Sequence, residues 1–115
     1  MKPLGQHITL DLYRCQNTAA SWNDSIRLMF LEALSKGKFN VLCDHHHQFE
    51  PHGVSGVFIL AESHLSVHIW TELNFVSLDE FWCGDQCDEQ VLINTISDYF
   101  LPEEVEFKYI PRGFL

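Results

Sequence analysis

The segment "LAESHLSVHIW", residues 60–70, places an acid, a hydroxyl group and two imidazoles inside a pattern that otherwise predicts a β-strand. Ser63 lacks the G-x-S-x-G surroundings of a hydrolase nucleophile and the acid-oriented base of a catalytic triad. The nearest electrophile to its hydroxyl group is the carbonyl group of the preceding residue, Glu62. These two residues therefore suggest attack of a serine on its own upstream peptide bond.

A second polar group combines a thiol, Cys43, with three imidazoles, His45, His46 and His47, and the segment "CGDQC" (83–87) adds two more thiols. Adjacent residues of an extended chain point to opposite faces, so three neighbouring histidines cannot all face one ion. The spacing of "CGDQC" also differs from that of a zinc knuckle. We expect no metal site, and we interpret the histidine run as a solvated polar turn.

The elements that must position these residues follow from the periodicity of apolar side chains. Asn23 or Asp24 is the expected cap of a first helix that stops at Gly37, Asp88 caps a second helix, and Asn74 marks a turn between strands. The predicted order is strand 7–13, a helix within 25–38, strand 39–44, loop 49–56, a strand from Val57, strands near 65–71 and 75–82, helix 88–100 and strand 105–110. This order predicts a two-layer α+β sandwich, with a mainly antiparallel sheet and helices on one face.

Composition limits the class of protein further. The chain has 115 residues, 46% hydrophobic and 20% charged, with a formal net charge of -9. The length fits one domain, residues 1–115, and the acidic balance argues against a nucleic-acid partner, which requires clustered Lys and Arg. No apolar run reaches membrane length and the first residues lack the apolar region of a signal peptide. We therefore expect a cytoplasmic protein with reduced cysteines and no membrane association.

Four segments resemble the bacterial S-adenosylmethionine decarboxylase proenzymes, which are pyruvoyl-dependent enzymes. "GVSGVFILAESHLSVHIWTE" (53–72) is similar to the stretch around that family's self-cleavage site, and "SLDEFWCG" (77–84) is similar to its D-x-F-x-C-G segment. The opening "KPLGQHITLDLYRC" (2–15) and the closing "PRG" (111–113) also resemble the ends of the family's chains. The resemblance covers nearly the whole chain, and the ESH core with the downstream CG is a specific signal.

The resemblance implies that the chain cuts itself between Glu62 and Ser63. In the family, the matching serine attacks the preceding carbonyl group, elimination from the resulting ester breaks the chain, and hydrolysis leaves a pyruvoyl group. The expected products are a β chain of residues 1–62 and an α chain of residues 63–115. The covalently bound pyruvoyl group made from Ser63 would form a Schiff base with the substrate amine and accept the electrons released with carbon dioxide.

The resemblance also assigns roles to three further residues. His68 matches the processing base, Ser55 matches a residue that supports cleavage, and Cys83 matches the acid that protonates the decarboxylated carbon. An imidazole and a thiol both suit proton transfer near neutral pH. Each alone is more often structural, as a satisfied sheet histidine or an inert buried cysteine, but their joint spacing around Glu62 and Ser63 favours the functional interpretation.

Substrate contacts are expected along the same strand. His68, Trp70 and Glu72 are two residues apart, so in a strand they share one face. By resemblance, Phe49 and Trp70 match an aromatic pair that sandwiches adenine, and Glu72 matches the carboxylate that holds the ribose hydroxyls. A sulfonium substrate also favours aromatic faces. Without the resemblance, Phe49 and Trp70 would be interpreted as core residues.

The chain departs from the usual family pattern at four positions near the site. Ile69 and Thr71 stand where the family commonly has threonine and proline, and Glu80 and Trp82, before Cys83, stand where aliphatic and threonine side chains are common. The leading hypothesis is decarboxylation of S-adenosylmethionine for spermidine biosynthesis by a homodimer with sites at the interface. A pyruvoyl decarboxylase of ornithine or arginine, and an uncleaved regulatory paralogue without activity, remain as alternatives. A bulky Trp82 could reshape the pocket and change the substrate.

Overall fold

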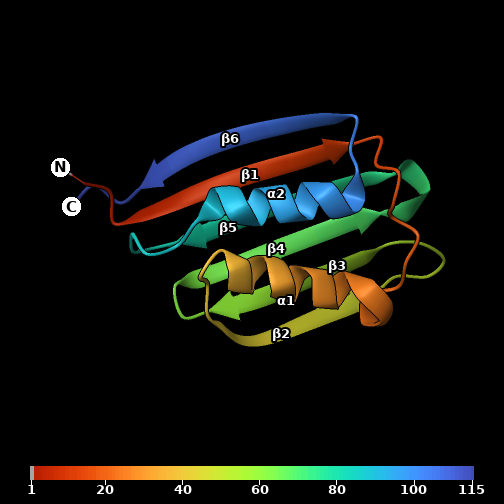
Figure 1. Ribbon diagram of the computed structural model, residues 1–115, viewed down its shortest axis with the longest axis horizontal. Helices are drawn as coiled ribbons and strands as arrows, with labels where there is room; N and C mark the ends of the chain where they lie inside the picture. Colours follow the sequence, from red (N-terminus) through yellow and green to blue (C-terminus); the bar gives the residue numbers. More distant parts are fainter. Residues whose placement is uncertain (1) are drawn as a thin grey trace.

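A six-stranded antiparallel sheet forms one layer of the structure, a computed structural model that describes residues 2–115 (Figure 1). The strands lie in the order β2-β3-β4-β5-β1-β6. Their bounds are β1 Gly5–Tyr13, β2 Val41–Gln48, β3 Val54–Leu60, β4 Ser63–Trp70, β5 Phe75–Trp82 and β6 Glu104–Arg112. The helical elements are a π-helical turn η1 Trp22–Ile26, helix α1 Arg27–Lys36, a 3-10 turn η2 Thr71–Leu73 and helix α2 Glu89–Phe100.

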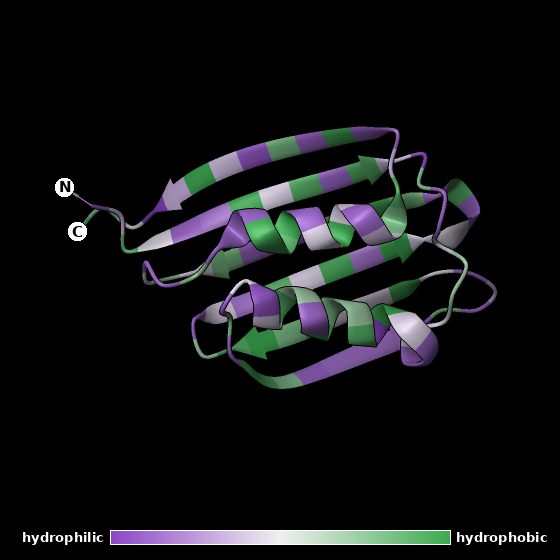
Figure 2. Cartoon of the chain, viewed as in Figure 1, coloured by the Kyte–Doolittle hydropathy of each residue, from purple (hydrophilic) through white to green (hydrophobic). Residues whose placement is uncertain are grey.

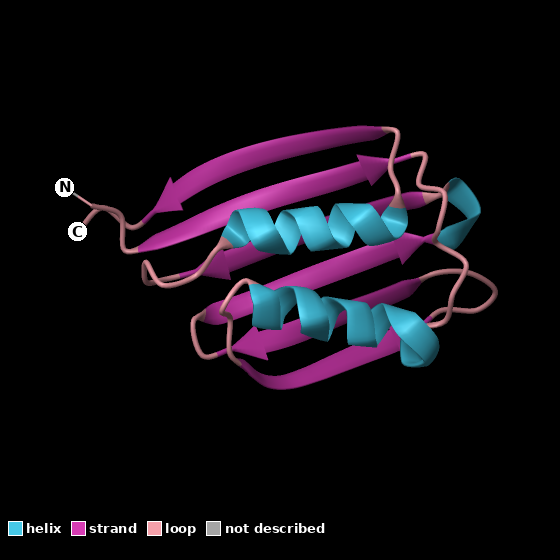
Figure 3. Cartoon of the chain, viewed as in Figure 1, coloured by secondary structure: helices cyan, strands magenta, loops and turns pink. Residues whose placement is uncertain are grey.

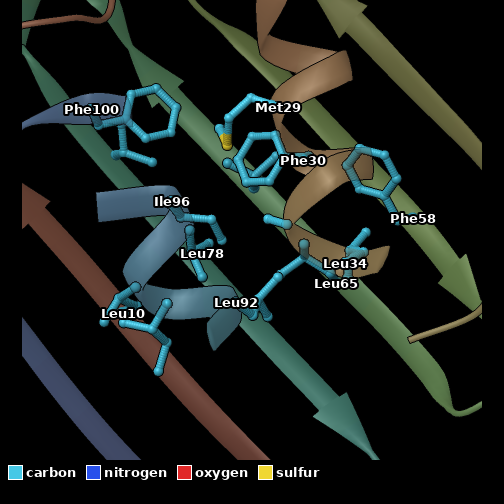
Figure 4. Close-up of a cluster of buried hydrophobic side chains, with 14 of the residues drawn as sticks. Leu10, Met29, Phe30, Leu34, Phe58, Leu65, Leu78, Leu92, Ile96 and Phe100 are labelled. Carbon is cyan, nitrogen blue, oxygen red and sulfur yellow. The ribbon is translucent and has the colours of Figure 1, made fainter. Parts of the chain in front are cut away.

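Helices α1 and α2 lie side by side on one face of the sheet, as Figure 3 shows. The core fills the space between the two layers, where Phe30 from α1, Phe100 from α2 and Phe58 from β3 are fully buried (Figure 4). Removing such large side chains from water contributes roughly 1.5–3 kcal/mol each. Within residues 2–115 the other face of the sheet carries no helix, so its side chains are free to form a site.

The predicted fold class is confirmed, and both helices were predicted close to their positions. Asp88 caps α2 by accepting a hydrogen bond from the backbone N–H of Val91, and Asn74 adopts the left-handed turn conformation before β5. The cap of the first helical segment was predicted wrongly: Ser21, rather than Asn23 or Asp24, accepts the hydrogen bond at its start. The reason is that a π-helical turn precedes α1 and moves the start of the helical segment upstream.

The predicted polar turn at the histidine run is wrong, because β2 continues to Gln48 and contains all three histidines. Figure 2 shows that most of β2 is hydrophilic, as suits a strand at the edge of a sheet. His46 faces the helices and stacks on Trp22 with ring centroids 5.5 Å apart, so His45 and His47 face the opposite side. Among residues 2–115, no group of three His, Cys, Asp or Glu side chains is arranged to hold a metal ion.

The predicted loop 49–56 is also too long, because β3 begins at Val54 and includes Ser55. Pro and Gly residues in the segment suggested a loop, but pairing with β2 and β4 orders its end. Strand β4 likewise starts earlier than predicted, at Ser63. Within residues 2–115, no helix is long and apolar enough to cross a membrane.

Candidate active site

The turn between β3 and β4 contains the peptide bond between Glu62 and Ser63. The carbonyl oxygen of Glu62 accepts a hydrogen bond from the backbone N–H of Cys83 at 3.1 Å, and the Cys83 thiol lies 3.4 Å from the same oxygen. Ser63 has a φ of 156°, in the positive range that residues other than glycine rarely adopt. A polarised carbonyl group beside a strained serine is suited to attack by that serine.

The side chain of Glu62 is held away from its own carbonyl group. Its two carboxylate oxygens accept hydrogen bonds from Asn40, one from the backbone N–H at 2.9 Å and one from the side-chain amide at 2.7 Å. Burial alone raises the pKa of the Glu62 carboxyl group, but the hydrogen bonds from Asn40 outweigh it and the net pKa is lowered. The carboxylate therefore stays ionised and fixes the turn before the Glu62–Ser63 peptide bond.

Ser55 and His68 form a pair across neighbouring strands. They are partners in the register of β3 and β4, and the Ser55 hydroxyl lies 2.7 Å from Nδ1 of His68. The neighbouring Gly56 faces Trp22 on the helix side, where an added Cβ would meet the indole ring at 2.2 Å. Ser55 and His68 therefore lie on the face of the sheet that the helices leave open.

A cavity of about 340 Å³ adjoins this pair at the end of β4. Phe49 and Trp70 contribute aromatic side chains to it and Glu72 contributes a carboxylate. Phe49 and Trp70 are 47% and 40% exposed, so they are not core residues. Glu72 lies in η2 rather than in β4, and the predicted shared strand face holds only for His68 and Trp70, although all three residues line one cavity. The full lining is Phe49, His52, Gly53, Val54, Ser55, His68, Ile69, Trp70 and Glu72.

One chain does not bring all the predicted site residues together. Ser63 begins β4 and His68 lies five positions further along it, which at about 3.3 Å per residue is a separation of roughly 16 Å. In Figure 1 the turn between β3 and β4 lies at the left end of the sheet, and η2 lies at the right end. The predicted site residues thus form two separate groups, which we name after their predicted roles. The cleavage half-site contains Glu62, Ser63 and Cys83, and the binding half-site contains Phe49, Ser55, His68, Trp70 and Glu72.

The four departures from the family pattern lie mostly away from the cavity. Trp82 is 1% exposed and packs edge-on against Phe39 on the helix side, with ring centroids 6.0 Å apart. Ile69 is also buried, although it adjoins the cavity, and Thr71 begins η2. Trp82 does not line the cavity, so the structure gives it no direct role in shaping that space.

Sequence reasoning did not identify Asn40, and it noted Glu80 only as a departure from the family pattern. Asn40 is 22 residues from Glu62 in the chain, and no spacing pattern signals such a contact. Glu80 is fully buried, and neither carboxylate oxygen has a hydrogen-bond partner. Burial, followed by the nearby charges of Glu89 and Glu62, raises its pKa to about 9. The burial of Glu80 could have been predicted from the alternation of β5, because even-numbered residues of this strand face the core.

Comparison with known proteins identifies the family to which this sequence and fold are similar. The sequence profile of the S-adenosylmethionine decarboxylase family matches residues 6–113. An S-adenosylmethionine decarboxylase proenzyme of Methanococcus maripaludis (strain C5) is 36% identical over 115 residues, which cover 100% of this chain and 94% of the relative. The proenzyme of Pyrococcus abyssi is 35% identical over 113 residues, 98% of this chain and 81% of that protein. The crystal structure of the adenosylmethionine decarboxylase from Aquifex aeolicus has a TM-score of 0.89 and 30% identity, and the match covers 100% of this chain and 95% of the other.

Fold and site together define a two-layer α+β domain with a polarised Glu–Ser peptide bond at one end of its sheet and an aromatic cavity at the other. The chain belongs to the S-adenosylmethionine decarboxylase family. This confirms the family that the resemblance implied. The narrower prediction of a bacterial member is not supported, because the sequence relatives named above are archaeal. The proenzyme names of these relatives are consistent with a chain that is processed after synthesis.

Proposed function

We propose that the chain cleaves itself between Glu62 and Ser63 into a β chain of residues 1–62 and an α chain of residues 63–115, and then decarboxylates S-adenosylmethionine. The product is S-adenosyl 3-(methylsulfanyl)propylamine, the aminopropyl donor for spermidine biosynthesis. The observation that carries the proposal is the hydrogen bond from the Cys83 backbone N–H to the Glu62 carbonyl oxygen, 3.1 Å long, beside Ser63 at a φ of 156°. The activity of the family and the names of the relatives support the substrate.

Processing would proceed in three steps. Ser63 Oγ attacks the carbonyl carbon of Glu62, the peptide C–N bond breaks, and the hydroxyl proton passes to the released amine, which leaves an ester. A base removes the α-proton of residue 63 and the Cβ–O bond breaks, leaving a carboxylate at Glu62 and a dehydroalanine. Hydrolysis of the dehydroalanine releases ammonia and leaves a pyruvoyl group. The Cys83 N–H stabilises the charge that develops on the Glu62 oxygen.

The residues of the two half-sites fit this group and its substrate. The pyruvoyl group supplies a carbonyl that binds the substrate amine and accepts the electrons released with carbon dioxide. The Cys83 thiol would return a proton to the substrate carbon, and its distance of 3.4 Å from the carbonyl oxygen of the residue before Ser63 supports this role. Phe49 and Trp70 bind the adenine, and Glu72 accepts hydrogen bonds from the ribose hydroxyls. His68, oriented by Ser55, is the processing base.

A homodimer follows from the roughly 16 Å that separate Ser63 from His68 along one strand. A two-fold axis through the middle of β4, near Ser66, brings the binding half-site of each copy toward the cleavage half-site of the other. The open sheet face supplies the contact surface, since no helix of the described part of the chain covers it. The cavity of about 340 Å³ in one chain is at the lower end for a small-molecule site, and a second copy completes its wall.

The intact mass of the purified protein tests the cleavage directly. We expect two chains that correspond to residues 1–62 and 63–115, and a single full-length chain for Ser63→Ala. Ser35→Ala removes an exposed hydroxyl group from α1, away from the open sheet face, and serves as the control, which should still be cleaved. A wild-type protein that stays at full length overturns the proposal and supports a regulatory paralogue.

Carbon dioxide release from S-adenosylmethionine, ornithine and arginine, assayed in parallel, tests the substrate. We expect release from S-adenosylmethionine only. Ornithine and arginine have no adenine for Phe49 and Trp70 to contact, so the two exposed aromatic side chains argue against them. Release from either amino acid by the cleaved protein would refute the substrate while leaving the cleavage intact.

A further inference from the structure

Strand β6, Glu104–Arg112, forms one edge of the sheet, and its outer side is unpaired within residues 2–115. Every residue of the strand is exposed. Val105, Phe107 and Tyr109 lie on the helix side, opposite Leu12, Leu10 and Ile8 of β1, and are 45%, 48% and 49% exposed. Figure 2 shows apolar and polar residues alternating along this edge. An exposed strand of nine residues with an apolar row is a template for pairing with another strand.

The backbone of β6 presents hydrogen-bonding groups to solvent at its odd-numbered residues. Cys83, directly after β5, donates its backbone N–H to the carbonyl oxygen of Glu62, directly before β4. Because backbone hydrogen bonds alternate in direction along an antiparallel strand, odd-numbered residues of β5 bond toward β4 and even-numbered residues of β5 bond toward β1. In the paired registers, even-numbered residues of β1 then bond to β5, and odd-numbered residues of β1 bond to even-numbered residues of β6. The backbone N–H and C=O of Phe107, an odd-numbered residue of β6, therefore point outward. Pro111 agrees with this assignment, because a proline in an edge strand sits where the N–H would face solvent.

We propose that β6 pairs with β6 of a second copy of this chain, antiparallel and centred on Phe107. In this register Phe107 faces its own counterpart and exchanges both backbone hydrogen bonds with it. Val105 faces Tyr109 twice, which pairs apolar side chains on the helix side. Glu106 faces Lys108 twice on the open side, which pairs opposite charges. The contact is isologous, and it joins two sheets into one of twice the width.

The charges of β6 select this register over its neighbours. Centring the pair on Glu106 places two carboxylates opposite each other, and centring it on Lys108 places two ammonium groups opposite each other. Like charges directly opposite destabilise a strand pair, and opposite charges stabilise it. A lysine on an edge strand normally discourages pairing, but here Lys108 already lies 3.5 Å from Glu106 of its own chain, and in the proposed register it also meets Glu106 of the second copy.

This interface is separate from both half-sites. Strands β1 and β5 lie between β6 and β4, and the edge pairing leaves the open sheet face uncovered. The proposal therefore does not rest on the proposed function. If the open faces also pair, the assembly is larger than a dimer.

Sedimentation of charge variants tests the interface. We expect Glu106→Lys and Lys108→Glu each to halve the mass of the assembly, because each places like charges opposite one another. The double variant Glu106→Lys with Lys108→Glu restores opposite pairs and should return the wild-type mass. Circular dichroism confirms that each variant is folded. The proposal is overturned if both single variants keep the wild-type assembly mass, or if the double variant does not regain it. Self-cleavage is measured separately, by intact mass.

An interchain disulfide tests the register. Hydrogen-bonded partners have Cα atoms about 5.5 Å apart, within the range that a disulfide spans. Phe107→Cys should therefore form a covalent dimer under mild oxidation. Val105→Cys is the matched control: its own counterpart lies four positions away, roughly 13 Å at 3.3 Å per residue, so no dimer should form. Equal crosslinking of the two variants refutes the register.

Discussion

Cys83 offers two donors to one oxygen, and we assign them different tasks. Its backbone N–H bonds to the Glu62 carbonyl oxygen at 3.1 Å, and its thiol lies 3.4 Å from the same atom. A backbone donor survives any substitution other than proline, whereas a thiol does not. Polarisation of the scissile bond and protonation of the substrate can therefore be separated by mutation.

Replacing Cys83 with alanine should leave self-cleavage intact and reduce decarboxylation. The N–H that polarises Glu62 remains, but the proton donor is lost, and loss of a positioned acid typically slows a reaction by about 10²–10⁴-fold. Intact mass reports cleavage, and carbon dioxide release reports activity. Cys43→Ala, an exposed thiol on β2, is the control and should affect neither. An uncut Cys83→Ala chain would show that the thiol itself takes part in processing.

Glu80 makes the stability of the fold depend on pH. Burial, followed by the charges of Glu89 and Glu62, raises its pKa from 4.5 to about 9. The native state therefore binds this proton more tightly than the unfolded state does, so the stability is fully present below pH 4.5 and is lost progressively as the pH rises toward 9. At 1.36 kcal/mol per pH unit, the cost at pH 7 is on the order of 3 kcal/mol.

Glu80→Gln should remove this dependence. We expect its free energy of unfolding to exceed that of the parent by an amount that grows between pH 5 and pH 8, because glutamine does not ionise. Urea unfolding in the uncut Ser63→Ala background measures this with one covalent chain. Asp98→Asn, an exposed position on α2, should keep the parent's pH profile. A difference between Glu80→Gln and the parent that stays constant with pH would contradict the prediction.

At the scale of elements, periodicity predicted strand and helix type well because each element buries one face. Alternation located β1 and β5 closely, with Val76 and Leu78 facing the core. It failed for β2, where the buried face is small and His46 finds its partner in Trp22. No local pattern marks a polar strand at a sheet edge, since its order comes from pairing with β3.

Residues of the candidate site could be predicted from the sequence only where a motif or a local spacing marked them. Glu62 and Ser63 are adjacent, and the resemblance identified them directly. Asn40 could not be found, because its contact with Glu62 depends on how the turn after β3 meets the start of β2. The separation of His68 from Ser63 was available from strand length alone, but it required knowing that β4 is continuous from Ser63 to Trp70.

The packing of η1 on β3 sets the position of Ser55. An added Cβ at Gly56 would meet Trp22 ring atoms at 2.2 and 2.8 Å, and Trp22 is 1% exposed. Gly56→Ala should lower the free energy of unfolding by about 1–3 kcal/mol, as overpacking does in other cores. Urea unfolding in the uncut background measures the loss.

A double-mutant cycle distinguishes this clash from a general effect of the substitution. Trp22→Phe removes the ring atoms that meet the added Cβ, so Gly56→Ala should cost less in that background than in the parent. Equal costs in the two backgrounds would place the effect in the backbone of β3 rather than in its contact with Trp22.

At the scale of the whole molecule, the topology separates the two proposed half-sites within one chain. Antiparallel neighbours β3 and β4 meet at the Glu62 turn, so Ser63 lies at one end of β4 and the aromatic cavity at the other. Lengthening a loop would not join two ends of the same rigid strand. The proposed homodimer, with its second copy in the opposite orientation, joins them twice and would form one complete site at each end.

Two inactive chains should therefore complement each other. Ser63→Ala has no scissile serine but keeps His68, and His68→Ala keeps Ser63 but has no base, so each expressed alone should stay uncut. In a dimer of the two, His68 of the Ser63→Ala chain faces Ser63 of the His68→Ala chain, and that chain alone should be cleaved. Coexpression with distinguishable tags, followed by intact mass, measures which chain is cut. Absence of cleavage in a verified mixed dimer would mean that His68 acts within its own chain, which the roughly 16 Å between the two ends of β4 argues against.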